Sequence, residues 1–227
     1  MADAPSALDN SARRPGGVLR NNGLTITLAV AVLVSIALML VVGWSAFNEE
    51  LAEHARPAIG LLAYTTSGDF LSALFENWES EFLQMAVFVG LTAVLVQRGS
   101  AESRDPDAAD PGPSPLVLRA RTRLQRAGAW LYSYSLGLVL GLLFLLTFAA
   151  HLVNSARKAT ESAILHHAAP PSLAEHLVSA DFWFESLQNW QSEFLSTVVL
   201  VVLSIWLRYH GSPESKPVDA PHSSTGA

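Results

Sequence analysis

The sequence has no cysteine, few charged residues and no excess of basic residues. Because cysteine is absent, disulfides, thiolate metal ligands and cysteine nucleophiles are excluded. Charged residues make up 15% of the 227 residues and hydrophobic residues 50%, which leaves too few polar side chains for an ordinary soluble surface. The formal net charge of -6 provides no basic face for nucleic acid, so no nucleic-acid partner is expected. The composition therefore favours a protein embedded in a lipid bilayer.

Motifs for a known reaction are also missing. The sequence contains no nucleophile elbow, no phosphate-binding loop and no recognisable Ser/His/Asp arrangement, so we expect no enzyme activity, no catalytic residue and no cofactor. Histidines in acidic segments raise the alternative of a metal site. These are His54, His166, His167 and His176. None has a ligand spacing such as HExxH, and adjacent histidines point apart on a helix, so no metal site is expected.

Two long apolar runs predict transmembrane helices. Leu24 to Val42 has no charged residue, and its length is close to the roughly 20 residues that a helix needs to cross about 30 Å of hydrocarbon. Leu136 to Val153 is a second clear run. Two shorter runs, Phe82 to Val96 and Phe194 to Leu207, need further support before they are assigned as spans.

An internal repeat supplies that support. When the chain is aligned with itself so that Asp69 falls on Asp181, positions 69–103 match positions 181–215 without a gap, and 16 of the 35 positions are identical. Chance would give about two. The repeated motif is Asn-Trp-Glu/Gln-Ser-Glu-Phe-Leu, and the same offset aligns the two long apolar runs. The predicted fold class is therefore all-α: a polytopic membrane protein with four transmembrane helices, arranged as two tandem two-helix repeats.

The topology follows from the repeat and from the arginines. Because each repeat crosses the membrane twice, both copies insert the same way up, as parallel halves. Three arginines precede the run Leu24 to Val42, and six lie between the runs Phe82 to Val96 and Leu136 to Val153. This distribution predicts that both termini and the central linker are cytoplasmic. A cleaved signal peptide is the alternative for the first run. It fits less well, because the run is long and its counterpart lies inside the chain.

These runs set the predicted boundaries. They are a disordered cytoplasmic N-terminus (1–20), a first membrane repeat (21–98), a flexible cytoplasmic linker (99–118), a second membrane repeat (119–211) and a disordered C-terminal tail (212–227). Four arginines lie among apolar residues just after the linker: Arg119, Arg121, Arg123 and Arg126. They mark either the start of a membrane helix or an interfacial helix that faces anionic lipids.

Each copy of the motif is predicted to lie near the start of a helix. Asp69 and Asp181 occupy positions suited to an N-cap, and apolar residues follow them at helical spacing. A helix over residues 70–97 would be about 42 Å long, so its first turns must lie in the outer interface. Trp78 and Trp190 at that level are predicted to be interfacial aromatic residues.

The glutamates of the motif lie where contact with lipid is costly. Glu81 and Glu193 fall near the outer border of the hydrocarbon, and Asn77 and Asn189 precede them by one helical turn on the same helix face. We interpret these four residues as a polar clasp between helices. The alternative is a quasi-symmetric acidic site that shares a proton or binds a cation, because two close carboxylates do not both stay ionised cheaply.

Two further features bear on that alternative. The first copy has Glu76 and Glu79 where the second has Gln188 and Gln191, so any conduit would be asymmetric. His151, inside the second long run, is interpreted as a packed residue that hydrogen-bonds between helices rather than as a proton carrier.

The residues from Leu71 to Met85, LSALFENWESEFLQM, and from Gln97 to Arg104, QRGSAESR, resemble a family of small bacterial membrane proteins known only as a domain of unknown function. The resemblance extends from Arg20 to about Ser215. It implies a multi-pass protein of the bacterial inner (plasma) membrane with duplicated helix pairs, and it implies no activity, substrate or cofactor. The second copy departs from the FENWESEFLQM motif, because it has Gln188 and Gln191 in place of Glu76 and Glu79. Any role of these two glutamates would therefore belong to the first copy.

The sequence thus predicts a non-enzymatic structural or partner-binding membrane module held together by the duplicated polar motif. Its expected partners are the lipid bilayer, with anionic lipids, and a second copy of the chain or another membrane protein. The alternative function is a proton or cation conduit that uses Glu81 and Glu193. Metal binding by His54 and His166 is a third and weaker hypothesis.

Overall fold

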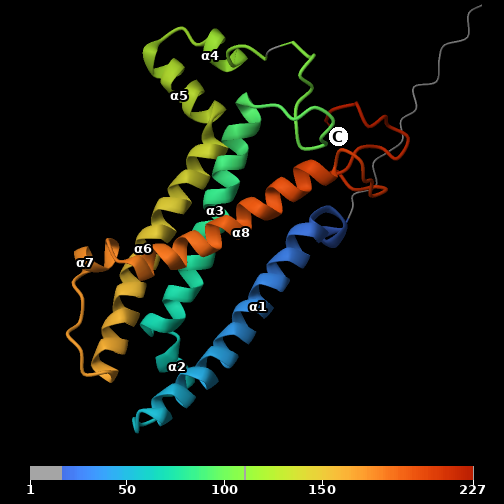
Figure 1. The fold of residues 1–227 in the computed structure, drawn as a ribbon. Helices are drawn as coiled ribbons and strands as arrows, with labels where there is room; N and C mark the ends of the chain where they lie inside the picture. Colours follow the sequence, from blue (N-terminus) through green and yellow to red (C-terminus); the bar gives the residue numbers. More distant parts are fainter. Residues whose placement is uncertain (1–16, 110, 227) are drawn as a thin grey trace, which may run out of the picture. The chain divides into compact units, whose positions relative to one another are not determined.

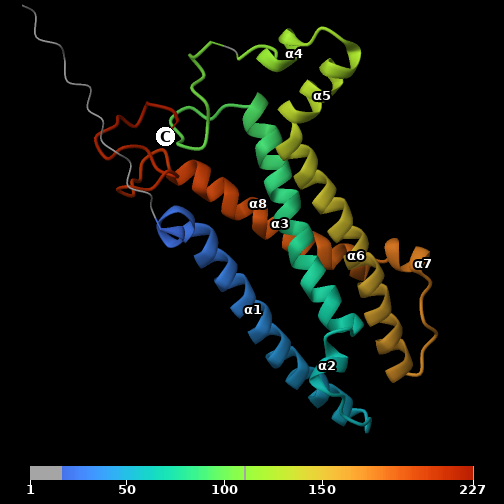
Figure 2. The same ribbon diagram turned by 180° about the vertical axis from the view of Figure 1, so that it is seen from behind.

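The computed structural model describes residues 17–109 and 111–226, which divide into two units at Thr65 and Thr66. The first unit contains helices α1 (Val18–Glu53) and α2 (Leu61–Tyr64). The second unit contains α3 (Gly68–Val94), α4 (Pro115–Arg119), α5 (Arg123–Ser133), α6 (Ser135–Leu165), α7 (Leu173–Leu177) and α8 (Ala180–Leu203) (Figures 1 and 2). The described residues contain no strand, so the all-α prediction is confirmed.

Two of the described helices are long and apolar enough to cross a membrane. They are residues Asn21–Glu53 of α1 and the whole of α6, Ser135–Leu165. We predicted four such helices, and α3 and α8 are not among those that qualify. The physical reason is that the polar motif occupies the middle of both helices and lowers their hydropathy. Membrane crossing by α3 and α8 therefore stays a prediction.

The first unit is held together by polar contacts near the end of α1. Trp44 Nε1 donates a hydrogen bond of 2.7 Å to the backbone oxygen of Ile59, and Ile59 N donates one of 2.8 Å to Asn48 Oδ1. Tyr64 packs against Gly43, where a side chain would meet the tyrosine hydroxyl at 2.5 Å. Most other side chains of α1 are exposed.

The second unit is built on the antiparallel pair α3 and α6, which lie side by side in both views (Figures 1 and 2). The close approach at one end depends on Gly68, where a Cβ would lie 2.5 Å from the backbone nitrogen of Lys158. The backbone N–H of Gly68 donates a hydrogen bond of 3.3 Å to Glu161 Oε1 of α6. Helix α8 crosses this pair and packs on α3.

The helix starts differ from the predicted ones by two positions. Ser67 and Ser179 are the N-caps of α3 and α8, and their hydroxyls accept hydrogen bonds of 3.2 Å from Phe70 N and Phe182 N. Asp69 and Asp181, which we predicted as caps, lie in the first helical turn instead. There, a negative charge still interacts favourably with the helix dipole.

The segment after the linker forms two short helices rather than one. Thr122 separates α4 from α5 and caps α5 through a capping box with Gln125. All four predicted lipid-facing arginines are exposed: Arg119, Arg121, Arg123 and Arg126. Their contact with lipid stays a prediction.

The C-terminal segment has a defined path where we predicted disorder. Lys216 is buried, and its ammonium donates to backbone oxygens of Ile205, His222 and Ser224 at 2.9–3.2 Å and to that of Gly99. Such a buried ammonium needs these acceptors, which tie the tail to the loop after α3. The predicted disordered N-terminus falls mainly on residues 1–16, which lie outside the described residues.

Candidate functional site

A polar stripe runs along the buried face of α6. It consists of Thr147, His151, Asn154 and Ser155, whose helical spacing places them on one side of the helix. His151 is fully buried, and its ring centroid lies 5.1 Å from that of Phe182, which is also fully buried. The histidine of α6 therefore packs on one side against an aromatic ring of α8.

Helix α3 brings Glu79 to one side of this histidine. Glu79 is fully buried, and its Oε2 lies 3.0 Å from His151 Nδ1. The other carboxylate oxygen, Oε1, accepts a hydrogen bond of 3.1 Å from Trp190 Nε1 of α8. One carboxylate thus joins all three long helices of the second unit.

Helix α8 brings Glu185 to the other ring nitrogen. Glu185 Oε2 lies 3.8 Å from His151 Nε2 and accepts a hydrogen bond of 3.1 Å from Ser155 Oγ. The serine oxygen is also 2.8 Å from Nε2 of His176 in α7. Burial lowers the pKa of His176 and so favours the neutral ring, although the nearby Glu185 acts in the opposite direction. A neutral His176 donates to Ser155, and Ser155 donates to Glu185.

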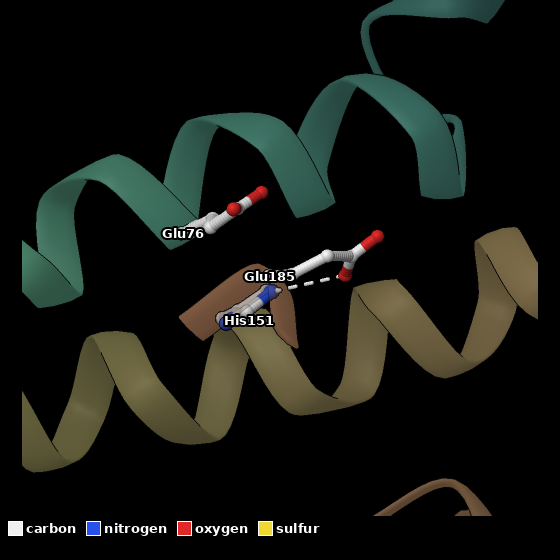
Figure 3. A group of neighbouring side chains, drawn as sticks. All are labelled: Glu76, His151 and Glu185. Carbon is white, nitrogen blue, oxygen red and sulfur yellow. Dashed lines mark ion pairs between the residues drawn. The ribbon is translucent and has the colours of Figure 1, made fainter. Parts of the chain in front are cut away.

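Glu76 completes the group on the α3 side. One carboxylate oxygen of Glu76, one of Glu185 and one ring nitrogen of His151 lie within 4.8 Å of one another. Figure 3 shows these three side chains coming from three different helices, with His151 and Glu185 joined by an ion pair. Asn189 donates its side-chain amide to Glu76 Oε1.

We call Glu76, Glu79, His151 and Glu185 the buried cluster, after Glu79 and His151, which are fully buried, whereas Glu76 and Glu185 are half-buried. It contains three carboxylates and one histidine, and the nearest described ammonium is that of Lys158, 3.9 Å from Glu185 Oε1. Among the described residues, Glu79 Oε2 and both ring nitrogens of His151 are buried and make no hydrogen bond of standard geometry. Buried charges require compensation, so this arrangement suits a bound proton or a bound cation.

The sequence model of one protein family, described as a domain of unknown function (DUF6766), matches residues 16–227. The chain belongs to the DUF6766 family. No curated protein and no solved structure matches it. The family match covers every residue of the buried cluster, and it supports the predicted resemblance to a family without an assigned activity.

In this DUF6766 chain the four residues of the predicted polar clasp do not meet as a group. Asn77 is exposed and donates to the backbone oxygen of Ala73 in its own helix. Glu81 is exposed and lies near enough to Glu193 to interact with it electrostatically. Asn189 reaches across the helices, but to Glu76 rather than to a clasp glutamate.

The two tryptophans that are predicted to be interfacial have different surroundings. Trp78 is partly exposed and packs edge-on against Phe75 of its own helix. Trp190 lies among the rings of Phe144, Phe148 and Trp183 and bonds to the buried Glu79. The second tryptophan therefore contributes to the cluster as well as to any interfacial belt.

The self-alignment draws attention to positions with identical residues, such as Asn77 and Glu81. The buried cluster lies instead at positions where the aligned residues differ. The aligned pairs are Met39 and His151, Ala73 and Glu185, Glu76 and Gln188, and Glu79 and Gln191. Glu185 was not singled out, because its counterpart is an alanine. The four cluster residues have one feature in common in the sequence: each is an ionisable residue aligned with a residue that is not ionisable.

Proposed function

We propose that this DUF6766 protein is a multi-pass protein of the bacterial inner membrane that works as a non-enzymatic structural or partner-binding module. In this proposal the buried cluster, rather than Asn77, Glu81, Asn189 and Glu193, clasps α3, α6 and α8 together. The observation that carries it is the position of Glu79, which contacts His151 of α6 and Trp190 of α8 at once. Breaking such a buried pair is costly, so the helices should stay together.

The membrane assignment is supported by the apolar surfaces of α1 and α6. Leu24, Leu33 and Val42 of α1 are 66–76% exposed, and Leu136 and Leu145 of α6 are 61–62% exposed. Leucine and valine at this density on two long helices are typical of lipid-facing surfaces.

The duplicated unit is supported by local geometry at equivalent positions of the self-alignment. Ser67 and Ser179 cap their helices with equivalent hydrogen bonds. After the helices, Ser103 Oγ accepts a hydrogen bond of 2.8 Å from Gln97 N, and Ser215 Oγ accepts the equivalent one of 2.9 Å from Tyr209 N. Repeated hydrogen bonds at helix starts and loops favour two copies of one structural unit.

The parallel arrangement is supported by the side chains that pair across α3 and α8. Three hydrogen bonds join the helices, and the partners are 113, 111 and 113 residues apart. Equivalent residues face one another in this way when two helices related by a pseudo-two-fold axis cross beside that axis. We extend this to four crossings with both termini in the cytoplasm, where the exposed arginines of α4 and α5 would meet anionic lipids.

The natural absence of cysteine makes the topology directly testable. Single cysteines at exposed positions in the linker, between α6 and α7 and in the tail would be made as Ala108→Cys, Ala168→Cys and Ser223→Cys. In intact spheroplasts, a membrane-impermeant maleimide should label only Ala168→Cys. Labelling of the linker or tail variants from outside, or release of the protein by an alkaline wash, would contradict the proposed topology.

A proton or cation conduit is a second candidate, favoured by the electrostatic proximity of Glu81 and Glu193. It predicts ion flux in proteoliposomes that the double change Glu81→Gln and Glu193→Gln abolishes while the fold persists. The module proposal predicts no difference in flux between the wild type and this variant. Circular dichroism of both proteins would confirm that the comparison is made on folded chains.

A further inference from the structure

We propose that the buried cluster binds one divalent transition-metal ion, with Glu76, His151 and Glu185 as ligands. The inference rests on the proposed role of the cluster in joining α3, α6 and α8, and it gives that role a ligand. It does not depend on the number of membrane crossings.

The distances fit an ion of this kind. In metal sites, imidazole nitrogen and carboxylate oxygen lie about 2.0–2.2 Å from Zn²⁺, so the ligand atoms lie about 3–4 Å from one another. His151 Nε2 and Glu185 Oε2 are 3.8 Å apart, which is too far for a hydrogen bond and suitable for two ligands of one ion. A ligand atom of Glu76 lies within 4.8 Å of the other two, so a small side-chain rotation would complete the group.

The histidine supplies an independent indication of a ligand. It is fully buried, and each ring nitrogen faces a carboxylate oxygen, Nδ1 that of Glu79 at 3.0 Å and Nε2 that of Glu185 at 3.8 Å, but neither contact has standard hydrogen-bond geometry within the described part of the chain. A buried imidazole without a well-formed hydrogen bond is rare, because desolvation of the nitrogens is then only partly compensated by the neighbouring carboxylates. A metal ion at Nε2 would compensate one nitrogen, and a slight realignment of Glu79, 3.0 Å from Nδ1, would compensate the other.

The surroundings resemble the outer shell of a metal site. A metal-bound histidine usually donates its second N–H to a carboxylate, which is the place of Glu79. The two carboxylate ligands are themselves hydrogen-bonded, Glu76 by Asn189 and Glu185 by Ser155. These contacts would fix the orientation of the ligands before the ion arrives.

The donor set indicates the class of metal. Two carboxylates and one imidazole suit Zn²⁺, Mn²⁺, Fe²⁺ or Co²⁺, whereas Mg²⁺ and Ca²⁺ favour oxygen donors alone. Three carboxylates beside one lysine also leave a negative excess that a divalent cation would balance. The competing interpretation is an ion pair of protonated His151 with its carboxylates and no metal.

The test is Co²⁺ binding to the full chain in detergent micelles, after removal of metal with a chelator. The proposal predicts saturable uptake of one Co²⁺ per chain with visible absorption from a nitrogen and oxygen ligand set, and displacement of Co²⁺ by Zn²⁺. Glu76→Gln and Glu185→Gln should each weaken binding at least about tenfold, and Glu79→Gln by roughly 10- to 100-fold. Far-UV circular dichroism checks that each variant is folded.

Two matched controls address other carboxylates and histidines. Asp219→Asn removes an exposed carboxylate and His210→Gln removes an exposed histidine, neither of which belongs to a proposed site, so both should bind Co²⁺ as the wild type does. The proposal is overturned if folded wild-type protein takes up no Co²⁺, or if Glu76→Gln and Glu185→Gln both retain wild-type affinity. In either case, the clasp still stands if Glu79 and His151 remain energetically coupled without metal.

Discussion

Phe182 shows how a single apolar residue supports the buried cluster. Its side chain is fully buried, and its ring centroid lies 5.1 to 5.7 Å from those of His151, His176 and Phe148. It excludes water from both histidines and brings α6, α7 and α8 together. The low local dielectric that results strengthens every charge interaction in the cluster.

Replacement of this ring should therefore be strongly destabilising. We expect Phe182→Ala to lower the free energy of unfolding by about 3–5 kcal/mol, since it removes apolar contacts and leaves a cavity. Phe184→Ala, on the same helix and 68% exposed, is the matched control and should have a much smaller effect. Reversible unfolding in mixed micelles measures both, and equal losses would contradict the assigned packing.

At the scale of helices, the caps explain where α3 and α8 begin. The serines at these positions accept hydrogen bonds from Phe70 N and Phe182 N, which are backbone donors of the first helical turn. Aspartate, which follows shortly after each serine, is an equally good capping type, so composition alone does not choose between them. The choice follows from the extended backbone at Ser67 and Ser179, with ψ of 154° and 149°.

The cap of α8 gives a prediction at this scale. We expect Ser179→Ala to destabilise the protein by about 1 kcal/mol, because Phe182 N loses its partner. Ser196→Ala is the matched control, since that hydroxyl only bonds back to Glu193 O within the same helix. Thermal unfolding would compare the two, and a cap variant as stable as the control would show that the assigned cap is unimportant.

The helices themselves were the most predictable part of the molecule. The runs Leu24 to Val42 and Leu136 to Val153 identified α1 and α6, because a long apolar run specifies a helix without reference to the rest of the chain. The ends of α3 and α8 and the break at Thr122 were not predicted, since they depend on local caps. The path of the tail depends on Lys216 reaching backbone oxygens far away in sequence.

At the scale of the whole molecule, residues that correspond in the self-alignment meet at the ends of α3 and α8. Glu102 and Glu214, which occupy equivalent positions in the self-alignment, lie beside each other in the loops that follow these helices. Burial, and then the neighbouring Glu214, raise the pKa of Glu102 above its ordinary value of 4.5. The protonated form is thus favoured in the folded state.

This pair predicts the direction of a pH effect. A carboxyl group whose pKa is raised by folding contributes stability below its unfolded pKa, and that contribution is lost as pH rises through the folded pKa. Glu102→Gln, which stays neutral, should therefore be more stable than the wild type near pH 7 and should lose the advantage at about pH 4. Asp219→Asn, an exposed carboxylate of the tail, is the control. Unfolding across this pH range measures the effect, and a Gln variant that is less stable than the wild type at neutral pH would contradict it.

The buried cluster could be predicted only in part, for a reason that concerns the whole molecule. Its residues come from three helices, and His151 and Glu79 lie far apart in the sequence. The repeat directed attention to Asn77 and Glu81 because they recur, whereas the crossing of α8 over α3 brings the residues unique to one copy together. Hydropathy and self-alignment contain no information on that crossing.

In the proposed clasp, the contact between Glu79 and His151 holds the helices of the second unit together. A double-mutant cycle tests it, with Glu79→Gln and His151→Met taking their replacements from Gln191 and Met39 of the other copy. Unfolding free energies would be measured in mixed micelles with a chelator present, so that metal makes no contribution. We predict losses of about 3–5 kcal/mol for each single change and a coupling energy of at least about 1 kcal/mol. Losses that add within about 0.5 kcal/mol would contradict the claim.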